Sequence, residues 1–345
     1  MKSSSLRQLF NRPQENQIFI IADLGLTNGG SLQRALELID VASELGVDAV
    51  KFQMLDSEEL LGDKTAEYTY PTIINGNKTE NMYEMFLGLE FNDNEWRTIK
   101  AECNRLGLGL IITCHVQSAV ERLNKLDLPV NKICSWSLSH FKMIGSLAQN
   151  GKPLILDTGP INQKELNEIR AFYSDNGGGE VFVLFDFHTE KTETMNFLAI
   201  KSLIENGYEV GYTPQGRRDW LDFMAIGLGA NIIEKRLTLS RTKPENGHWK
   251  AHEPSEFAEW MSHINECYIA LGEQKLTPTP DDLAATKNWY KSAWLERDVS
   301  RGELITEEAF TYKRPGNGIT SKEIAKLYIG HKFTKNYQKG DFFEG

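Results

Sequence analysis

The sequence contains little cysteine, and its cysteines are not spaced for metal or redox chemistry. Cys103, Cys114, Cys134 and Cys267 include no CxxC pair. Zinc sites and redox dithiols use such close pairs, and disulfide-stabilised domains are far richer in cysteine. We therefore expect neither a structural zinc nor a disulfide framework. Three of the four cysteines fall inside predicted elements, where they would act as small core residues.

Long apolar runs and an excess of positive charge are also missing. No apolar stretch is long enough to span a membrane, and the N-terminal segment MKSSSLRQLFNRPQEN lacks the apolar centre of a signal peptide. The formal net charge is −10, which disfavours nucleic acid as a partner. We expect a cytoplasmic protein that binds neither membranes nor nucleic acid.

The sequence does contain a repeated pattern, in which a short apolar run ends in a polar or charged residue and a helical stretch follows. The apolar runs are Gln17–Ala22, Asp48–Val50, Leu108–Ile112, Val130–Cys134, Pro153–Leu156, Val181–Phe185, Glu209–Tyr212 and Asn231–Ile233. Ser31 before the first helical stretch and Gly46 after it are typical helix boundaries. Strand and helix alternating in this way predict a closed (β/α)₈ barrel, an α/β fold whose functional residues lie at the C-terminal strand ends.

Two regions depart from this pattern. Residues 54–91 are too long for a simple connection and are rich in tyrosine and methionine, so we expect a lid, an oligomer contact or a packed Ω-loop there. Residues 278–292 contain the motif TPTPDD and predict a linker. Residues 293–345 predict a small β-rich domain, which would be marginal alone, after a barrel domain spanning residues 1–277.

Two lysines mark a candidate anion site. Lys51 follows one apolar run and Lys132 lies inside another, where a buried cation needs a partner. A phosphate or carboxylate ligand would suit both ammonium groups, with the hydroxyls of Thr113 and Ser135 beside them. We favour such a ligand. Internal salt bridges are the alternative, and their candidate partners are Asp23, Asp157 and Asp186.

Several motifs, in this order, resemble the sialic acid synthase family, whose members condense phosphoenolpyruvate to make nonulosonic acids. They are IADLGLTNGGSLQRALELIDVASELGVDAVKFQ near the start, GYTPQG at 211–216, GLGANIIEKRLTLSR at 227–241, GHWKAHEPSEF at 247–257 and RPGNGI at 314–319. The resemblance implies a barrel followed by an antifreeze-like (SAF, β-clip) domain. It also implies a homodimer in which that small domain covers the partner's barrel mouth.

The resemblance and the strand-end positions together assign expected roles to particular residues. Those expected to bind phosphoenolpyruvate are Lys51, Gln53, Thr113, Lys132, Ser135, Asp186 and Thr213. Those expected to contact the sugar acceptor are Asn28, His248 and Arg314, the last reaching into the partner's site. Asp23, His188 and Arg236 are the candidates for the catalytic steps, and His115 is a weaker one.

The chain departs from the family pattern where the family binds a divalent metal, commonly manganese. Two histidines hold that metal in the family, and here their positions carry Gln215 and Arg236. A guanidinium has no lone pair to donate and carries a fixed charge, so we expect no metal cofactor at this position. His248 and His252 form an H-x₃-H pair, but the flanking glycine and proline favour a loop over a metal-binding helix.

Acidic residues of the family are also replaced. The family's SGE is Ser135-Trp136-Ser137 here, and the loss of such substrate-side acids indicates a changed sugar acceptor. We favour a synthase that joins phosphoenolpyruvate to an aldehyde sugar or sugar-like acceptor and gives a 2-keto-3-deoxy sugar acid. In that hypothesis Arg236 takes over the electrostatic role of the metal. The alternative is a catalytically silent or regulatory homologue that binds a phosphorylated anion or a partner subunit.

Overall fold

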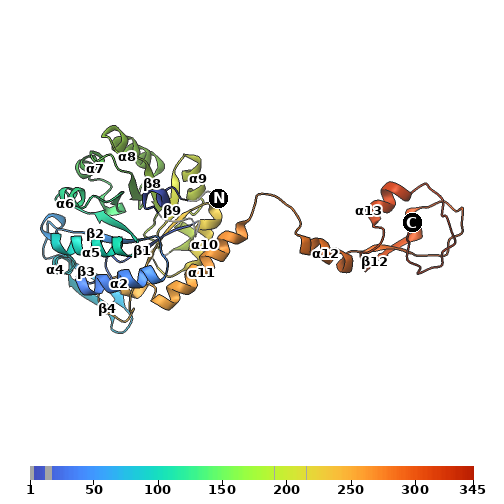
Figure 1. The fold of residues 1–345 in the computed structure, drawn as a ribbon, viewed down its shortest axis with the longest axis horizontal. Coiled ribbons are helices and arrows are strands. Elements are labelled where there is room, and N and C mark those ends of the chain that lie inside the picture. The colour runs from blue at the N-terminus through green and yellow to red at the C-terminus, as the bar shows by residue number, and fades with distance from the viewer. Residues whose placement is uncertain (1–3, 12–17, 190, 215) are drawn as a thin grey trace. The chain divides into compact units, whose positions relative to one another are not determined.

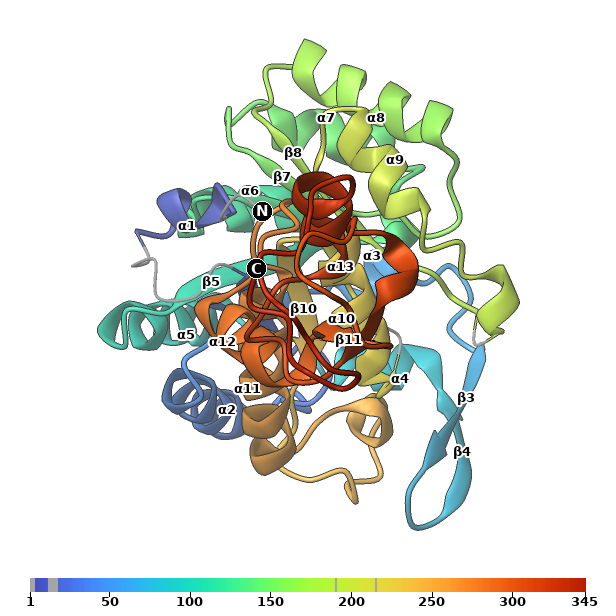
Figure 2. The same cartoon turned by 90° about the vertical axis from the view of Figure 1, so that its right-hand side faces the viewer.

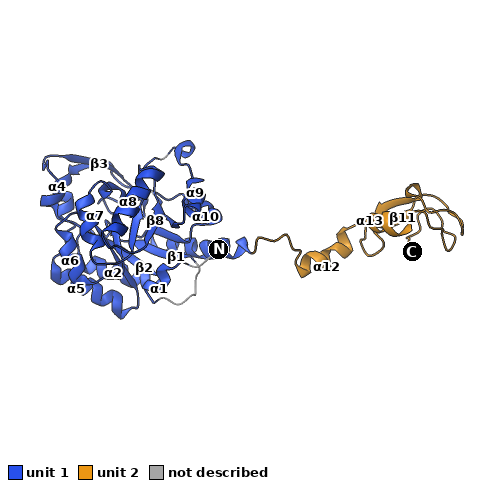
Figure 3. Cartoon of the chain, turned by 90° about the horizontal axis from the view of Figure 1, so that it is seen from above, with its two compact units in different colours: residues 1–272 blue, residues 273–345 orange. Residues whose placement is uncertain are grey.

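The protein is described by a computed structural model that covers residues 4–11, 18–189, 191–214 and 216–345. The chain divides into two compact units, residues 1–272 and 273–345 (Figure 3). Within the segment predicted as a linker, Pro280–Trp289 form helix α12, which belongs to the second unit. Thr279 caps that helix by accepting a hydrogen bond from the Asp282 N–H, and a proline occupies its first turn.

Parallel strands of the first unit close into a barrel, which confirms the predicted (β/α)₈ architecture (Figure 1). Each predicted apolar run coincides with one of these strands, although Gln17, where the first run begins, lies outside the described residues. The barrel strands are β1 (Phe19–Asp23), β2 (Ala49–Met54), β5 (Gly109–Cys114), β6 (Asn131–Ile133), β7 (Leu154–Asp157), β8 (Val181–Phe185), β9 (Glu209–Tyr212) and β10 (Ile232–Arg236). They follow one another around the barrel in chain order, and β10 pairs with β1.

Helices follow the barrel strands in the chain and cover the barrel (Figure 1). They are α2 (Leu32–Glu44), α5 (Asp93–Arg105), α6 (Ala119–Leu126), α7 (Phe141–Ala148), α8 (Gln163–Asp175), α9 (Ala199–Glu205), α10 (Asp219–Leu228) and α11 (Pro254–Leu271). The Ser31 side chain caps α2 as predicted, and Gly46 beyond its end has a positive φ of 76°. Within the described part of the chain, no helix combines the length and apolar character needed to cross a membrane.

The barrel interior is apolar at one end. Inward-facing residues of the strands form a buried cluster that includes Phe19, Ile21, Ile155 and Phe182. Helix α1 (Leu6–Leu9) packs against this cluster through Leu6, which is completely buried. The short helix therefore closes the N-terminal end of the barrel, and the C-terminal strand ends are left to form a site.

Residues 54–91 form regular structure of their own, which contradicts the Ω-loop alternative and leaves the lid and the oligomer contact as predictions. This segment contains α3 (Ser57–Leu60), the hairpin β3 (Glu67–Thr72) and β4 (Gly76–Asn81), and α4 (Met82–Leu87). Figure 2 shows the hairpin projecting from the barrel. The cross-strand contact of Thr69 with Thr79, whose hydroxyl oxygens lie 2.8 Å apart, belongs to this pairing. Alternating polar side chains hide such a hairpin from a search for apolar runs.

The second unit is a small fold with its own core. Beyond α12 it contains β11 (Ser292–Leu295), which pairs antiparallel with β12 (Phe310–Lys313), and the short helical turns α13 (Ser321–Glu323) and η5 (Ile324–Tyr328). Isolated bridges, such as that between Val299 and Tyr337, add to the extended structure. Phe310, Phe333 and Phe343 lie at the centre of a buried cluster. These features agree with the β-rich character expected of residues 293–345.

Candidate active site at the barrel mouth

The charged residues of the barrel mouth continue the inward-facing rows of its apolar core. Side chains alternate between the two faces of a strand, so residues two positions apart face the same way. Ile21, Ala49 and Ile232 belong to the apolar core of the barrel. Two residues further along the same strands, Asp23, Lys51 and Glu234 face the interior at the mouth. The same step on the other strands leads to Thr113, Lys132, Asp157 and Asp186.

A continuous chain of ion pairs links these residues across the barrel. Arg236 contacts Asp23 Oδ2 through Nε at 3.0 Å and through a terminal nitrogen at 2.8 Å. The Lys51 ammonium lies 2.7 Å from Asp23 Oδ1 and 3.0 Å from Glu234 Oε1. Lys132 completes the chain, 3.1 Å from Glu234 Oε2 and 2.5 Å from Asp157 Oδ1. Salt bridges to Asp23 and Asp157, two of the partners weighed as an alternative from the sequence, are thus present, with Glu234 as an additional partner.

Burial makes this chain electrostatically strong. Burial alone would raise the pKa of Asp23, but Lys51 and Arg236 together hold it well below its usual range. The pKa of Lys132 is raised, because Asp157 and Glu234 outweigh the cost of burying the ammonium. The pKa of Asp157 is also raised, mainly by burial and further by Glu234 and Asp186. Asp23 is therefore a permanent carboxylate, whereas Asp157 can take up a proton closer to neutral pH.

A second group of contacts lies beside the ion-pair chain. Ser135 begins the short helix η1 (Ser135–Ser137), and its Oγ lies 3.0 Å from His188 Nε2 and 3.3 Å from Asp186 Oδ2. His188 Nε2 is also 3.3 Å from Asp186 Oδ2. Burial and, to a smaller extent, Lys250 lower the pKa of His188. The imidazole is therefore neutral at pH 7, and it stacks on Trp136 with ring centroids 4.3 Å apart.

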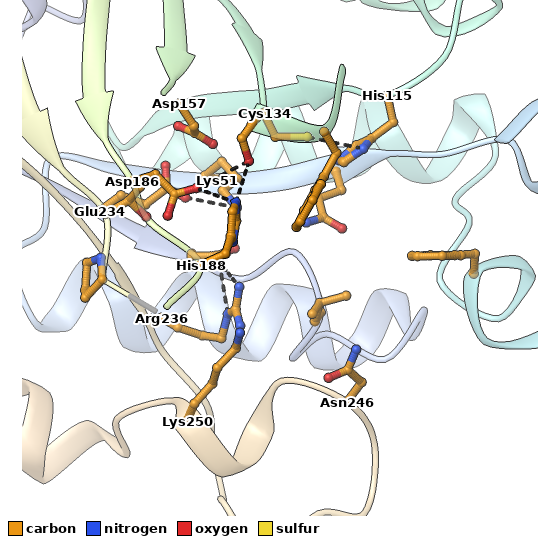
Figure 4. Close-up of a pocket in the computed structure, with 18 of the residues that line it drawn as sticks. Lys51, His115, Cys134, Asp157, Asp186, His188, Glu234, Arg236, Asn246 and Lys250 are labelled. Carbon is orange, nitrogen blue, oxygen red and sulfur yellow. Dashed lines mark hydrogen bonds and ion pairs between the residues drawn. The ribbon is translucent and has the colours of Figure 1, made fainter. Parts of the chain in front are cut away.

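These groups border a cavity of about 600 Å³ at the C-terminal ends of the strands. Figure 4 shows Asp186, His188, Arg236 and Lys250 converging on it from separate strands and loops. Predicted site residues that line this cavity are Asp23, Lys51, Gln53, Ser135, Asp186, His188, Thr213 and Arg236. Lys132 and Thr113 are buried beneath them, outside the lining.

Two predicted acceptor contacts lie outside the lining, and the third, Arg314, stays a prediction because its expected role is in the partner's site. Asn28 is buried and donates hydrogen bonds to the carbonyls of Leu24 and Gly25, so it holds its own loop. His248 is also buried outside the lining, with Nδ1 2.6 Å from the Thr238 hydroxyl. Arg314 belongs to the second unit, where its Nε donates to the Trp289 carbonyl at 2.8 Å.

Other lining residues were not singled out from the sequence. Lys250 lies in the short helix η3 (His248–Lys250), and burial next to Arg236 lowers its pKa to about 7. Cys134 was expected in the core but is half-buried at the cavity, with Sγ 3.6 Å from His115 Nδ1. Burial, with Lys51 and Lys132 nearby, lowers the pKa of His115 to about 4. Glu234 could have been found by extending the two-residue alternation beyond Ile232.

The residues at the mouth do not fit the divalent metal that the family resemblance implies. Arg236 holds its guanidinium against Asp23, and this group has no lone pair to donate and carries a fixed charge that repels a cation. Across the described residues, no group of three or more histidine, cysteine or acidic side chains is arranged to hold a metal ion. Gln215 lies outside the described residues. His252 does not pair with His248 but lies 3.0 Å from Asp219 Oδ1.

A closed barrel with ionic groups gathered at its C-terminal strand ends is the arrangement of (β/α)₈ barrel enzymes. Residues 38–276 match the model of the NeuB family, so the chain belongs to the NeuB family. This confirms the predicted relationship to the sialic acid synthases.

Named relatives agree with this membership. The chain is 27% identical to N,N'-diacetyllegionaminic acid synthase of Legionella pneumophila, over 93% of this chain and 92% of that protein. It is 27% identical to pseudaminic acid synthase of Campylobacter jejuni, over 97% of each. The crystal structure of N-acetylneuraminic acid (sialic acid) synthetase from Leptospira borgpetersenii, in complex with citrate, has a TM-score of 0.67. That likeness has 23% sequence identity and covers 78% of this chain and 90% of the other, so it supports the fold.

Proposed function

We propose that this chain is a synthase that condenses phosphoenolpyruvate with an aldehyde sugar or sugar-like acceptor. The observation that carries the proposal is the convergence of Lys51, Gln53, Ser135 and Thr213 on one cavity at the barrel mouth. The family resemblance implies the first three of these for phosphoenolpyruvate, and Thr213 is expected there as a strand-end residue. The relatives named as legionaminic and pseudaminic acid synthases support the same class of reaction.

The proposed reaction forms one carbon–carbon bond and breaks one phosphate ester. C3 of phosphoenolpyruvate bonds to the aldehyde carbon, and the aldehyde oxygen takes up a proton to become a hydroxyl. Water adds at C2, and inorganic phosphate leaves, so that C2 becomes a ketone. The products are a 2-keto-3-deoxy sugar acid and phosphate. An aldehyde oxygen that gains negative charge needs a positive group close to it.

Arg236 is the group proposed to polarise the aldehyde. Its guanidinium is held in place by two contacts with Asp23, and its side chain lines the cavity. A fixed positive charge there would stabilise the developing oxyanion where the family resemblance implies a metal. The sequence makes Asp23 a candidate for the catalytic steps, but its low pKa favours the role of a permanent partner for Arg236 and Lys51.

Two groups are suited to move protons. His188 is neutral at pH 7, and its Nε2 already lies within hydrogen-bonding distance of the Ser135 hydroxyl. Lys250 has a pKa of about 7, so its ammonium and amine forms are both populated at neutral pH. A general acid or base works best when its pKa lies near the working pH. We propose Lys250, in its ammonium form, as the donor of the proton to the aldehyde oxygen, and His188, as a neutral imidazole, as a proton acceptor.

One observation favours a second candidate function, a catalytically silent homologue that binds a phosphorylated anion. Lys51 and Lys132 are already neutralised by Asp23, Asp157 and Glu234. Phosphoenolpyruvate would have to share these lysines with the carboxylates. Uptake of a proton by Asp157, whose pKa is raised, would release Lys132 for the ligand.

Phosphate release separates the two functions. Full-length protein is mixed with phosphoenolpyruvate and a panel of aldoses, and phosphate is measured with and without each aldose. The synthase predicts aldose-dependent phosphate release that Lys51→Met abolishes. Lys164→Met is the matched control, because Lys164 lies on α8 outside the cavity with a side chain that is 86% exposed. Thermal stabilisation by phosphoenolpyruvate without phosphate release from any aldose would instead support the silent homologue.

A further inference from the structure

A second, smaller pocket shares no residue with the cavity at the barrel mouth. It lies between α5 and α6, two helices that contact each other on the outside of the barrel (Figure 1). Its volume is about 60 Å³, which is room for about four to six water molecules at about 10–15 Å³ each. A single phosphoryl group matches this space, whereas a whole sugar does not.

The walls of this α5–α6 pocket are cationic. Arg97 borders it from α5, and Arg122 and Lys125 border it from α6. Among the described residues that line the pocket, Asp93 is the one carboxylate. A hydrogen bond from Arg122 lowers the pKa of Asp93, and the charges of Arg97 and Lys125 act in the same direction. Three positive charges therefore face one negative charge, in a protein whose formal net charge is −10.

The three cations differ in how firmly they are already engaged. Arg122 is held by Asp93, whose Oδ1 lies 2.7 Å from Nε. Lys125 pairs with Glu121 at 2.7 Å, but both side chains are exposed, so this pair is weak. Arg97 is exposed and donates to an amide oxygen of its own helix, and it forms no ion pair with the described residues. Arg97 and Lys125 are therefore the cations that a ligand can recruit.

The buried side of the pocket is apolar except for one polar atom. Met54, Trp96 and Leu126 border the pocket and are buried. Trp96 is 1% exposed, and its indole N–H has no hydrogen-bond acceptor among the described residues. A buried donor without an acceptor is unfavourable. An unmet donor beside a group of cations is a combination that suits an oxyanion.

We propose that the α5–α6 pocket is a second anion site, which binds a phosphoryl group and regulates the cavity at the barrel mouth. The excess of positive charge in the lining matches a dianion. A phosphoryl group also has enough oxygens to accept hydrogen bonds from Arg97, Lys125 and Trp96. A carboxylate carries one charge and two oxygens, so it would leave one of these donors unused.

Trp96 connects the pocket with residues that border the barrel cavity. Its ring packs edge-on against Phe52, with centroids 6.2 Å apart and an interplanar angle of 85°. Phe52 lies on β2 between Lys51 and Gln53, which both border that cavity. Met54, the last residue of β2, borders the α5–α6 pocket itself. Because side chains in a protein interior are close-packed, a ligand that displaces the indole also displaces this strand end.

NMR of the indole N–H groups tests binding, because different tryptophans report on the two sites. Trp96 borders the α5–α6 pocket, and Trp136 borders the barrel cavity. Inorganic phosphate is titrated into full-length wild type, Arg97→Met, Lys125→Met and Arg105→Met, and a Trp96→Phe variant identifies the Trp96 signal. Arg105→Met is the matched control, because Arg105 lies on α5 outside the pocket with a side chain that is 62% exposed.

Phosphate should shift the Trp96 signal of wild type and of Arg105→Met. In Arg97→Met and in Lys125→Met, the phosphate concentration at half of this shift should rise by about ten-fold, the loss expected for one charge-assisted hydrogen bond. Any response of Trp136 should be the same in all four proteins. A Trp96 signal that does not shift in wild type would overturn the site. An undiminished shift in Arg97→Met would also overturn it, since phosphate would then act from the barrel cavity.

Two further titrations define the ligand. Acetate should bind more weakly than phosphate, and tighter binding of acetate would overturn the assignment to a phosphoryl group. Glycerol 3-phosphate distinguishes the source of that group. Tighter binding than phosphate supports a phosphorylated organic molecule, and weaker binding supports the free ion, in each case at the same site.

The regulatory part rests on the proposed synthase function and is tested by turnover. Glycerol 3-phosphate should change KM for phosphoenolpyruvate by about five-fold or more in wild type and in Arg105→Met, and by much less in Arg97→Met. An equal change in Arg97→Met would overturn the regulation, because it would show competition inside the barrel cavity. An unchanged KM in wild type would overturn it as well. If no aldose gives phosphate release, the synthase function fails, and the NMR titration still decides the α5–α6 site.

Discussion

Replacing Lys132 with methionine tests the ion-pair chain that organises the barrel mouth. Lys132 has a side chain with no exposed surface, and it lies 2.5 Å from Asp157 and 3.1 Å from Glu234. Methionine keeps much of its volume but leaves two buried carboxylates short of a positive partner. Removing one member of a buried ion pair costs about 3–5 kcal/mol of unfolding free energy. At about 2–4 °C per kcal/mol, Tm should fall by about 6–20 °C.

The pH dependence of this loss is a second, independent result. The folded-state pKa values of the stranded carboxyl groups will lie above their unfolded values, as that of Asp157 already does in the wild type. The resulting penalty is complete above the raised pKa and disappears as the pH falls and the carboxyl groups take up protons. The difference in Tm between wild type and Lys132→Met should therefore be larger at pH 8 than at pH 5.

Thermal unfolding followed by circular dichroism on full-length protein measures both effects. Adding Asp157→Asn to Lys132→Met should recover part of the lost stability, because it removes one stranded charge. The control is Lys125→Met, which breaks the exposed pair of Lys125 with Glu121 and should leave Tm unchanged. The expected fall in Tm is about 6–20 °C. A Tm for Lys132→Met within about 2 °C of wild type at both pH values would therefore refute the stabilising role of the ion-pair chain.

Three further predictions address ligand binding and assembly. Arg236→Ala should lower aldose-dependent phosphate release by about a hundred-fold or more and retain the thermal shift with phosphoenolpyruvate. Unchanged turnover would exclude Arg236 as the group that polarises the aldehyde. Lys250 loses its charge as the pH rises through about 7. Sulfate remains a dianion over this pH range, so its binding should weaken by up to about ten-fold per pH unit above pH 7. Lys250→Arg should abolish that dependence, and a steep dependence in the variant would assign it to another group. Full-length protein should be a dimer and residues 1–272 a monomer by light scattering, and a full-length monomer at micromolar concentration would contradict the exchange of small domains.

The barrel and the charged character of its mouth could be predicted because both follow from local patterns. An apolar run ending in a charged residue marks a strand and its inward face, since side chains alternate with a period of two. Asp23, Lys51 and Asp186 were therefore recognised as strand-end groups, and all three border the cavity. Glu234 and Arg236 obey the same alternation on β10.

Pairing between strands could not be predicted in the same way. Asp23 contacts Lys51 and Arg236 because barrel closure sets all three in register, which depends on strands far apart in the sequence. Burial by distant segments likewise sets the pKa of Lys250. Asn28 shows the opposite case, because a polar residue in the loop after a strand can donate hydrogen bonds to the backbone of that loop instead of facing the cavity.

The central claim is that this barrel forms a carbon–carbon bond with phosphoenolpyruvate, and one measurement tests it directly. Phosphoenolpyruvate labelled with ¹³C at C3 is incubated with full-length protein and N-acetylmannosamine, and the products are followed by NMR. The account predicts that the label moves into the C3 methylene of a 2-keto-3-deoxy sugar acid, with one phosphate released for each product formed. Label that remains in phosphoenolpyruvate, or appears only in pyruvate, with every aldose of the panel would contradict the account.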